Sequence, residues 1–165
     1  MRALPKFSVL LGTVCTTAGL ALAAAEPPKE GNYDFISCQS GVANPIVFSK
    51  TNSAATYEYS GATLSNPPGD MFDRASFRCV GLGTSFDGKT TVTAICEAIY
   101  PDGDKVLLRT SVGADGTGSR EAIAGTGKYE GLVSTGTVTP VGTFPVIKAG
   151  TFQSCSHQTG TYKLK

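Results

Sequence analysis

The chain has 165 residues, with 14 Lys and Arg against 13 Asp and Glu, and 41% of its residues are hydrophobic. A balance this close to neutral excludes the strongly basic surface that general nucleic-acid or anionic-membrane binding requires. The length suits one domain with a substantial core.

The first 25 residues have the pattern of a secretory signal peptide. Arg2 and Lys6 supply a positive start, residues 7–22 are largely apolar, and the alanines at 23–25 suit signal peptidase. The alternative, a membrane-spanning helix, needs about 20 apolar residues, and threonines interrupt this shorter run. We therefore predict cleavage after residue 25 and a β-barrel domain over 26–165.

The domain left after cleavage carries 12 basic and 13 acidic residues, because the leader removes Arg2 and Lys6 and no acid. Its basic residues are scattered, so we expect no nucleic-acid partner. It has no second apolar stretch of spanning length, so we expect no stable membrane insertion after signal cleavage. No Asn-x-Ser/Thr sequon occurs, which favours a periplasmic or secreted bacterial protein.

Short β-rich segments begin the domain, at residues 33–40 and 54–59. The sequence Asn-Pro-Pro-Gly-Asp at 66–70 predicts a loop that leads to a short turn at Met71 and Phe72. The domain shows no apolar period of helical type and length, so we expect an all-β fold.

The central hairpin is the most specific local signal. Two β-rich runs at 74–86 and 89–100 are separated by Asp87-Gly88, a dipeptide typical of a two-residue primed turn. That turn places Cys79 directly opposite Cys96, at a non-hydrogen-bonded position where Cα atoms come closest.

Four cysteines remain after the leader, which would take Cys15 with it, and an even number in an oxidising compartment predicts two disulfides. Four cysteines allow three pairings. The register favours Cys79–Cys96, which leaves Cys38–Cys155 to join the first strand to the last, and the other two pairings stay open. No CxxC or histidine-rich spacing accompanies these cysteines, so we expect no metal site.

A second turn follows at 100–104, where Tyr-Pro-Asp-Gly-Asp suits a three-residue hairpin loop. Asp102 and Asp104 resemble the start of a calcium loop, but the glycine position and the distant glutamate of such loops are missing. We interpret the segment as a turn and predict no cofactor. The turn sets Ile95 opposite Arg109.

These registers sort the side chains of three strands into two faces. We predict that the uncharged face is the core side. It carries Phe77, Cys79, Gly81, Gly83, Val92, Ala94, Cys96, Ala98, Tyr100, Val106 and Leu108. The other face carries Arg78, Val80, Leu82, Ile95, Glu97, Ile99, Leu107 and Arg109.

Arg78, Glu97 and Arg109 are neighbours on the mixed face and are our first candidates for site residues. Outside a barrel they would form surface ion pairs worth about 0 to 1 kcal/mol each. Inside a barrel they would be desolvated and would mark a polar ligand pocket. We favour the outside. Glu58 is the fourth candidate, and it faces away from the two tyrosines that flank it.

Further strands are predicted at 120–124, 132–139 and 160–164, separated by Gly, Pro, Asn and Ser clusters. Residues 140–150 predict a long apolar loop that folds across an open end of the sheet and covers an edge or a mouth. Many short strands at this spacing indicate a sandwich or a barrel.

Residues 121–138 resemble the Gly-Thr-Gly-aromatic-x-Gly segment of the allene oxide cyclase-like and dirigent-like barrel families. The matching positions are Gly125, Thr126, Gly127, Tyr129 and Gly131. With the hairpin at 100–104, the resemblance spans about residues 75–139. It implies a single antiparallel β-barrel of about eight strands in which the glycine segment is structural. The substrate-contacting groups of those families have no match here, so the resemblance carries over no catalytic residue.

We favour a non-catalytic barrel that is structural or binds a small apolar or amphipathic ligand, because no nucleophile motif, phosphate loop or metal cluster occurs. The first alternative is a cyclase-like or isomerase-like enzyme that confines an apolar substrate in the lumen and uses Glu97 with its two arginines, or Glu58. The second is a secreted protein-interaction module. We expect His157, the single histidine, at the surface.

Overall fold

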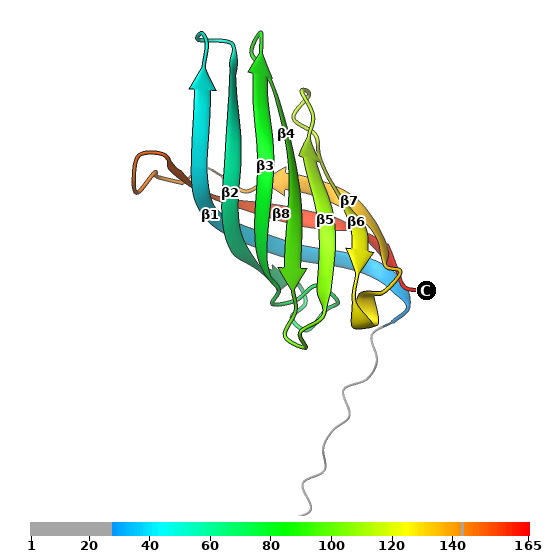
Figure 1. The fold of residues 1–165 in the computed structure, drawn as a ribbon. Helices are drawn as coiled ribbons and strands as arrows, with labels where there is room; N and C mark the ends of the chain where they lie inside the picture. The colour runs from blue at the N-terminus through cyan, green and yellow to red at the C-terminus, as the bar shows by residue number, and fades with distance from the viewer. Residues whose placement is uncertain (1–27, 143) are drawn as a thin grey trace, which may run out of the picture.

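The computed structural model describes residues 28–142 and 144–165, so the predicted leader at 1–25 lies outside the described residues. The described chain forms antiparallel strands and a short 3-10 helix (Figure 1). In chain order the elements are β1 (Glu30–Val47), β2 (Ser53–Ser65), β3 (Ser76–Phe86), β4 (Lys89–Ile99), β5 (Lys105–Val112), β6 (Gly118–Gly125), η1 (Gly127–Tyr129), β7 (Val133–Pro140) and β8 (Thr151–Lys163).

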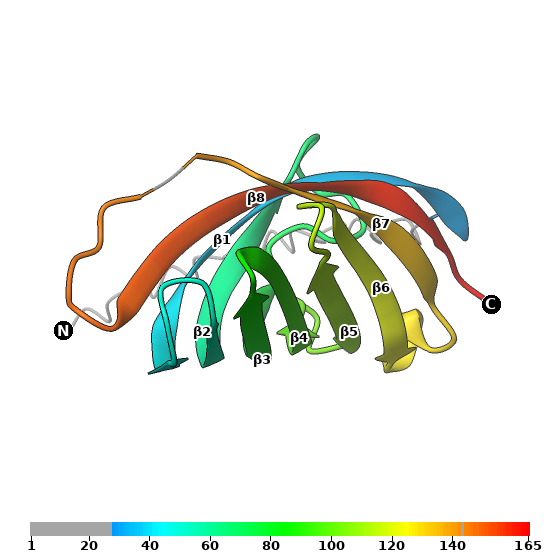
Figure 2. The ribbon, with the colours of Figure 1, turned by 90° about the horizontal axis from the view of Figure 1, so that it is seen from above.

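Each strand pairs with the next along the chain, and β8 returns to pair with β1, which closes the barrel. β1 is long enough to serve both neighbours, because residues 30–42 pair with β8 and residues 35–47 pair with β2. Seen from above, β8, β1 and β7 form one wall and β2 to β6 form the other (Figure 2). The predicted closed antiparallel barrel of eight strands is confirmed.

The predicted division into two faces is confirmed. Cys79, Cys96 and Val106 from the uncharged face are buried, whereas Arg78, Glu97 and the rest of the mixed face are exposed to solvent. Because successive side chains of a strand point to opposite faces, the closed sheet continues this division around the barrel, with an interruption at the bulge in β6 opposite Leu107 and Leu108.

The Asp87-Gly88 turn has the predicted geometry. Both residues have positive φ, 50° for Asp87 and 77° for Gly88, as a type I′ turn requires. The register that follows sets Cys79 opposite Cys96, and these two cysteines form a disulfide with their Cα atoms 4.0 Å apart. Both cysteines face the lumen and are almost fully buried.

The second disulfide, Cys38–Cys155, is also confirmed, and it joins β1 to β8 at directly opposed positions. Its cysteines lie on the outer face of the sheet, and Cys38 is exposed. One disulfide is therefore part of the core, and the other clamps the strand pair that closes the barrel from outside.

Three strands are clearly longer than the sequence predicts. β1 continues past residue 40 to Val47, β2 continues past residue 59 to Ser65, and β8 begins at Thr151 rather than at residue 160. Pro45 lies within β1 but past Val42, the last residue of β1 that pairs with β8, so its missing N–H leaves that ladder intact.

The predicted position of the loop after β7 is wrong. The loop was expected across an open end of the sheet, but Phe144 lies beside Cys38, Ser60 and Cys155 at a depression on the outer surface. Figure 2 shows the same course, with the loop passing outside β8 rather than over the interior.

The two disulfides differ in exposure, which predicts that a reductant opens one before the other. A thiol reductant must reach a sulfur atom, so native protein treated with dithiothreitol should open Cys38–Cys155 before Cys79–Cys96. Alkylation of the freed thiols followed by peptide mass spectrometry measures the order. Earlier labelling of Cys79 and Cys96, or a peptide that links Cys79 to Cys38 or Cys155, would contradict the structure.

Candidate functional site, a cavity in the barrel lumen

The lumen is filled at one end by aromatic rings and contains a cavity above them. The cavity has a volume of about 230 Å³. Its apolar wall is formed by Phe77, Cys79, Val92, Cys96, Ala98 and Leu108. The polar side chains that reach it are Ser37, Gln39, Tyr59, Thr63, Thr110, Arg120, Ser154, Ser156 and Gln158. Among the described residues that line it there is no Asp, Glu, His or Lys.

The filled end is an aromatic cluster built around Phe72. This side chain is fully buried, and it comes from the loop between β2 and β3 rather than from a strand. The rings of Tyr33, Phe35, Tyr100, Tyr129 and Tyr162 surround it, with centroids 5.1 to 6.4 Å away. The loop therefore plugs one end of the barrel and forms the floor of the cavity.

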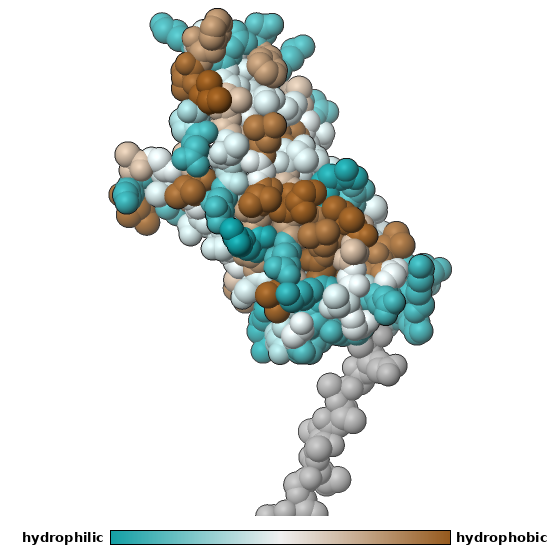
Figure 3. Space-filling model, in the orientation of Figure 1, coloured by the Kyte–Doolittle hydropathy of each residue, from teal (hydrophilic) through white to brown (hydrophobic). Residues whose placement is uncertain are grey.

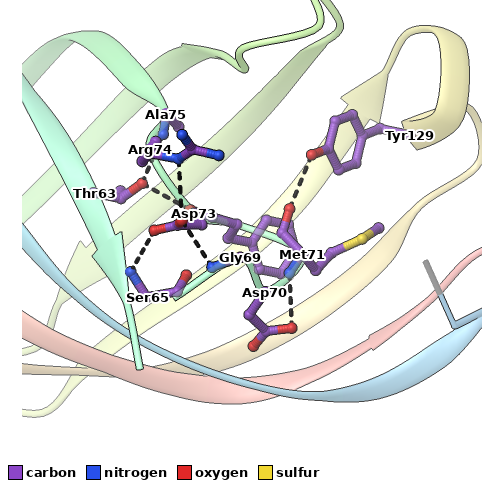
Figure 4. A network of polar contacts seen from close by, with 10 residues as sticks. Thr63, Ser65, Gly69, Asp70, Met71, Asp73, Arg74, Ala75 and Tyr129 are labelled. Atoms are coloured by element: carbon purple, nitrogen blue, oxygen red, sulfur yellow. Dashed lines mark hydrogen bonds and ion pairs between the residues drawn. The ribbon is translucent and has the colours of Figure 1, made fainter. Parts of the chain in front are cut away.

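Hydrogen bonds from the barrel wall hold this plug in place (Figure 4). The Thr63 hydroxyl donates to the Phe72 carbonyl at 2.7 Å and accepts the Ala75 N–H at 3.0 Å. From the opposite side, the Tyr129 hydroxyl donates to the Met71 carbonyl at 2.9 Å. These bonds satisfy backbone groups that the loop would otherwise bury without partners.

Asp73 organises the outer side of the plug. Its carboxylate accepts the N–H groups of Ser65 and Gly69, each at 2.9 Å, and pairs with the Arg74 guanidinium at 3.2 Å. Its side chain is only 8% exposed. Desolvation acts to raise the pKa of Asp73, but the two N–H donors and Arg74 outweigh it and hold the pKa below its usual value.

Arg120 is the charged side chain that lies inside the barrel. It points inward from β6 and is 3% exposed. Its guanidinium carbon lies 4.8 Å from the Phe72 ring centroid, 5.2 Å from that of Tyr33 and 5.5 Å from that of Phe35. Nη1 donates a hydrogen bond to the Ser134 hydroxyl at 3.2 Å. The guanidinium therefore lies between the aromatic floor and the cavity that it lines.

Two glycines make room for the ring of Tyr33. Gly136 and Gly160 face each other on β7 and β8, and a Cβ atom on either would collide with the Tyr33 hydroxyl. The buried Tyr33 hydroxyl has no hydrogen-bond partner among the described residues. The filled end thus depends on missing side chains in the wall as much as on the aromatic rings.

Tyr59 reaches across the lumen from β2 toward β4 and β5. Its hydroxyl lies 3.9 Å from the Cys96 sulfur. Burial raises the pKa of Tyr59, and the Thr110 side chain partly offsets this effect. Its hydroxyl is therefore neutral near pH 7 and can serve as a hydrogen-bond donor or acceptor beside the cavity.

The structure does not bring the four sequence-predicted site residues together in the lumen. All four lie on the outer face, and each of their side chains is at least 51% exposed. They are Arg78, Glu97, Arg109 and Glu58. Arg78 and Glu97 are directly opposed in the ladder, as predicted.

Their ion pairs nevertheless form with other partners. Arg78 pairs with Glu58 at 2.7 Å and Glu97 pairs with Lys105 at 2.7 Å, while Arg109 pairs with Glu121. The favoured surface placement of these groups is what the structure shows. The hypothesis of an enzyme that works in the lumen therefore loses the residues that were named for it.

The remaining polar candidates also lie outside the lumen. His157 is half-exposed on β8, with Nε2 2.7 Å from the Asp34 carboxylate. Asp102 pairs with Lys128 at 2.5 Å, and Asp104 accepts the Lys128 N–H at 2.9 Å. The 100–104 turn therefore docks onto η1. Within the described residues, no group of three or more His, Cys, Asp or Glu is placed to hold a metal ion.

The sequence reasoning missed Arg120, although a signal for it was present. Residues 120–124 were predicted as a strand, but their side chains were not assigned to the inner or the outer face. The outward placement of Arg109 would have suggested an outward ion pair with Glu121, and strand alternation then turns Arg120 inward. The sequence alone did not supply the pairing between β5 and β6 that this step needs.

No protein-family model matches this chain, and the search of curated proteins gave no match. Among residues 28–142 and 144–165, no helix is long and apolar enough to cross a membrane.

The environment of Asp73 predicts a pH-dependent contribution to stability. Asp73→Asn removes the charge that accepts two backbone N–H groups, so the free energy of unfolding at pH 7 should fall by about 1 to 3 kcal/mol. Because the folded-state pKa is lowered, the wild type has this stability above the pKa of the unfolded chain and loses it as pH falls through the folded pKa.

Urea unfolding of both proteins between pH 7 and pH 3 tests this prediction. The difference between wild type and Asp73→Asn should shrink on acidification. Asp87→Asn is the matched control, because Asp87 lies in an exposed turn whose positive φ asparagine also tolerates. An Asp73→Asn effect no larger than that of the control would show that the carboxylate does not hold the plug.

Proposed function

We propose that this chain is an exported, disulfide-stabilised barrel that binds a small apolar or amphipathic molecule in its lumen. The observation that carries the proposal is the cavity of about 230 Å³ above a floor that is packed with aromatic rings. The chain packs one end of the barrel with rings and leaves this cavity above them, although larger side chains at a few wall positions would close the space.

The dimensions and the lining suit a ligand of modest size. An apolar cavity of about 150 Å³ in a protein interior is enough to hold a benzene ring. The present cavity is larger, and its wall combines apolar side chains with hydroxyl and amide groups. Such a lining favours a compact molecule with an apolar body and one or two polar atoms.

The export part of the proposal rests on two features. The sequence of residues 1–25 has the pattern of a cleavable leader. Both pairs of the remaining cysteines are joined as disulfides, and stable disulfides form mainly in oxidising compartments such as the bacterial periplasm.

The outer surface gives less support to a protein-interaction module. Val80, Ile95, Leu107 and Ile123 are exposed on neighbouring strands, and Figure 3 shows an apolar band across β3 to β6. These side chains are aliphatic, whereas the central residues of protein interfaces are enriched in aromatic side chains. Nothing in the structure indicates what would cover it, so we place the function in the lumen.

A variant that fills the cavity tests the proposal. Thr110→Phe adds a ring inside the lumen, while Thr93→Phe adds the same ring on the outer face of the neighbouring strand. We expect the wild type and Thr93→Phe to bind the neutral probe naphthamide, and Thr110→Phe to bind it at least tenfold more weakly. Isothermal titration calorimetry measures the affinities.

Native mass spectrometry of protein purified from its own host provides the second measurement. A small molecule retained by the wild type and by Thr93→Phe, but absent from Thr110→Phe, supports the lumen as the site. Equal binding by both phenylalanine variants would place the ligand elsewhere on the protein. The absence of any bound molecule, together with failure to bind naphthamide, would leave a structural barrel.

A further inference from the structure

We infer that the lumen ligand is an organic anion, a compact molecule with an apolar body whose carboxylate binds the Arg120 guanidinium. This inference rests on the proposed function, because it names the chemical class of the ligand in the same cavity. The observation behind it is a buried positive charge that lines the cavity and has no negative partner within residues 28–142 and 144–165.

Arg120 forms no ion pair among the described residues. The acid next to it in sequence, Glu121, points outward and pairs with Arg109. The residues that line the cavity include no Asp or Glu, so no carboxylate approaches Arg120 through the lumen. A buried guanidinium loses its hydration, and proteins normally compensate that loss with a paired anion and further hydrogen bonds.

The hydrogen-bonding capacity of Arg120 is also largely unused. A guanidinium carries five N–H donors in a planar fork, and one of its nitrogens bonds to the Ser134 hydroxyl. The rings of Tyr33, Phe35 and Phe72 compensate part of the charge through their faces. Ring faces do not replace the two in-plane acceptors that a carboxylate presents to this fork.

The phenols of the floor do not supply the missing charge. Burial raises the pKa of Tyr100 to about 12 even though Arg120 acts to lower it. Burial also raises the pKa of Tyr129, whose hydroxyl is already a donor to the Met71 carbonyl. Both phenols are neutral at physiological pH, so an anion that balances Arg120 has to enter from the cavity side.

The wall above Arg120 defines the other part of the ligand. Cys96, Ala98 and Leu108 form an apolar surface on one side, and Phe77 with the Cys79–Cys96 disulfide extends it. A free inorganic anion would leave this apolar surface without a partner. A molecule with a carboxylate at one end and a ring or short hydrocarbon body at the other satisfies both parts of the cavity.

Matched acid and amide probes separate this inference from the proposed function. Naphthoate and naphthamide have the same shape and differ in charge, and hexanoate and hexanamide give a second pair with a flexible body. We expect the wild type to bind each acid at least tenfold more tightly than its amide in calorimetry at pH 7. Acetate and phosphate, titrated separately, test whether an anion without an apolar body is sufficient.

Two arginine variants test whether Arg120 causes the preference for acids over amides. Arg120→Met should bind naphthoate at least tenfold more weakly than the wild type and naphthamide about equally well. Arg78→Met is the matched control, because it removes an exposed positive charge from the outer face and should leave both affinities unchanged. If Arg120→Met does not fold, Arg120→Lys retains a charge without the planar fork, and the wild-type preference tests the inference by itself.

The outcomes distinguish the two claims. Equal affinity of wild type for acids and amides would overturn the anion inference and leave the proposed lumen site standing. No binding of either kind would overturn the proposed function and the inference with it. Acetate or phosphate binding as tightly as naphthoate would assign Arg120 to a free anion, and a preference that survives in Arg120→Met would place the recognition at another residue.

Discussion

The pairing of β1 with β8 is the constraint on which the rest of this structure depends. An open sheet of these strands would expose both of its faces to solvent. The pairing register of its edge strands could then shift by a residue at little cost in free energy. The ladder from Glu30–Lys163 to Val42–Thr151 removes that freedom, and the Cys38–Cys155 disulfide fixes its register at one point. Once the sheet is closed, the register of any one strand determines the inward side chains of all the others.

The two ends of the lumen then differ because of what the chain places inside them. At one end, the loop between β2 and β3 turns inward and inserts Phe72 among the rings of the wall, and Thr63, Asp73 and Tyr129 hold its backbone. Toward the other end, the rings of Tyr57 and Tyr59 pack against Phe152, and the inward positions in between carry serines, glutamines and small apolar residues. The cavity is the space between these two parts, with Arg120 at their boundary.

The burial of Arg120 is a cost to folding. A buried, unpaired guanidinium is a poor choice for stability, because apolar residues of similar size usually fill such a site at no loss. Its partner in the ladder between β6 and β7 is Gly136, and Tyr33 occupies the space that this glycine leaves. The arrangement keeps the charge in a fixed place beside an apolar cavity, which is the requirement for selecting one kind of ligand.

The glycine-rich segment after β6 was the basis of the resemblance to allene oxide cyclase-like and dirigent-like barrels. In the structure it forms the corner that includes η1, where Gly127 has φ of 52° and Gly131 has φ of 73°. These conformations favour glycine in any fold, so the corner accounts for the motif physically. Membership of those families stays a prediction.

Local sequence patterns determined the parts of this protein that depend on short-range geometry. The Asp87-Gly88 turn fixed one hairpin register, which in turn gave the Cys79–Cys96 disulfide and the inward face of three strands. The outward position of Arg78, Glu97 and Arg109 followed from the same count. The first half of β8 did not follow, because its inward residues Ser154, Ser156 and Gln158 are polar and remove the alternation that identifies a strand. The tertiary structure alone decided the hollow lumen, the inserted Phe72 and the burial of Arg120, since each depends on contacts between strands or loops that are far apart in the chain.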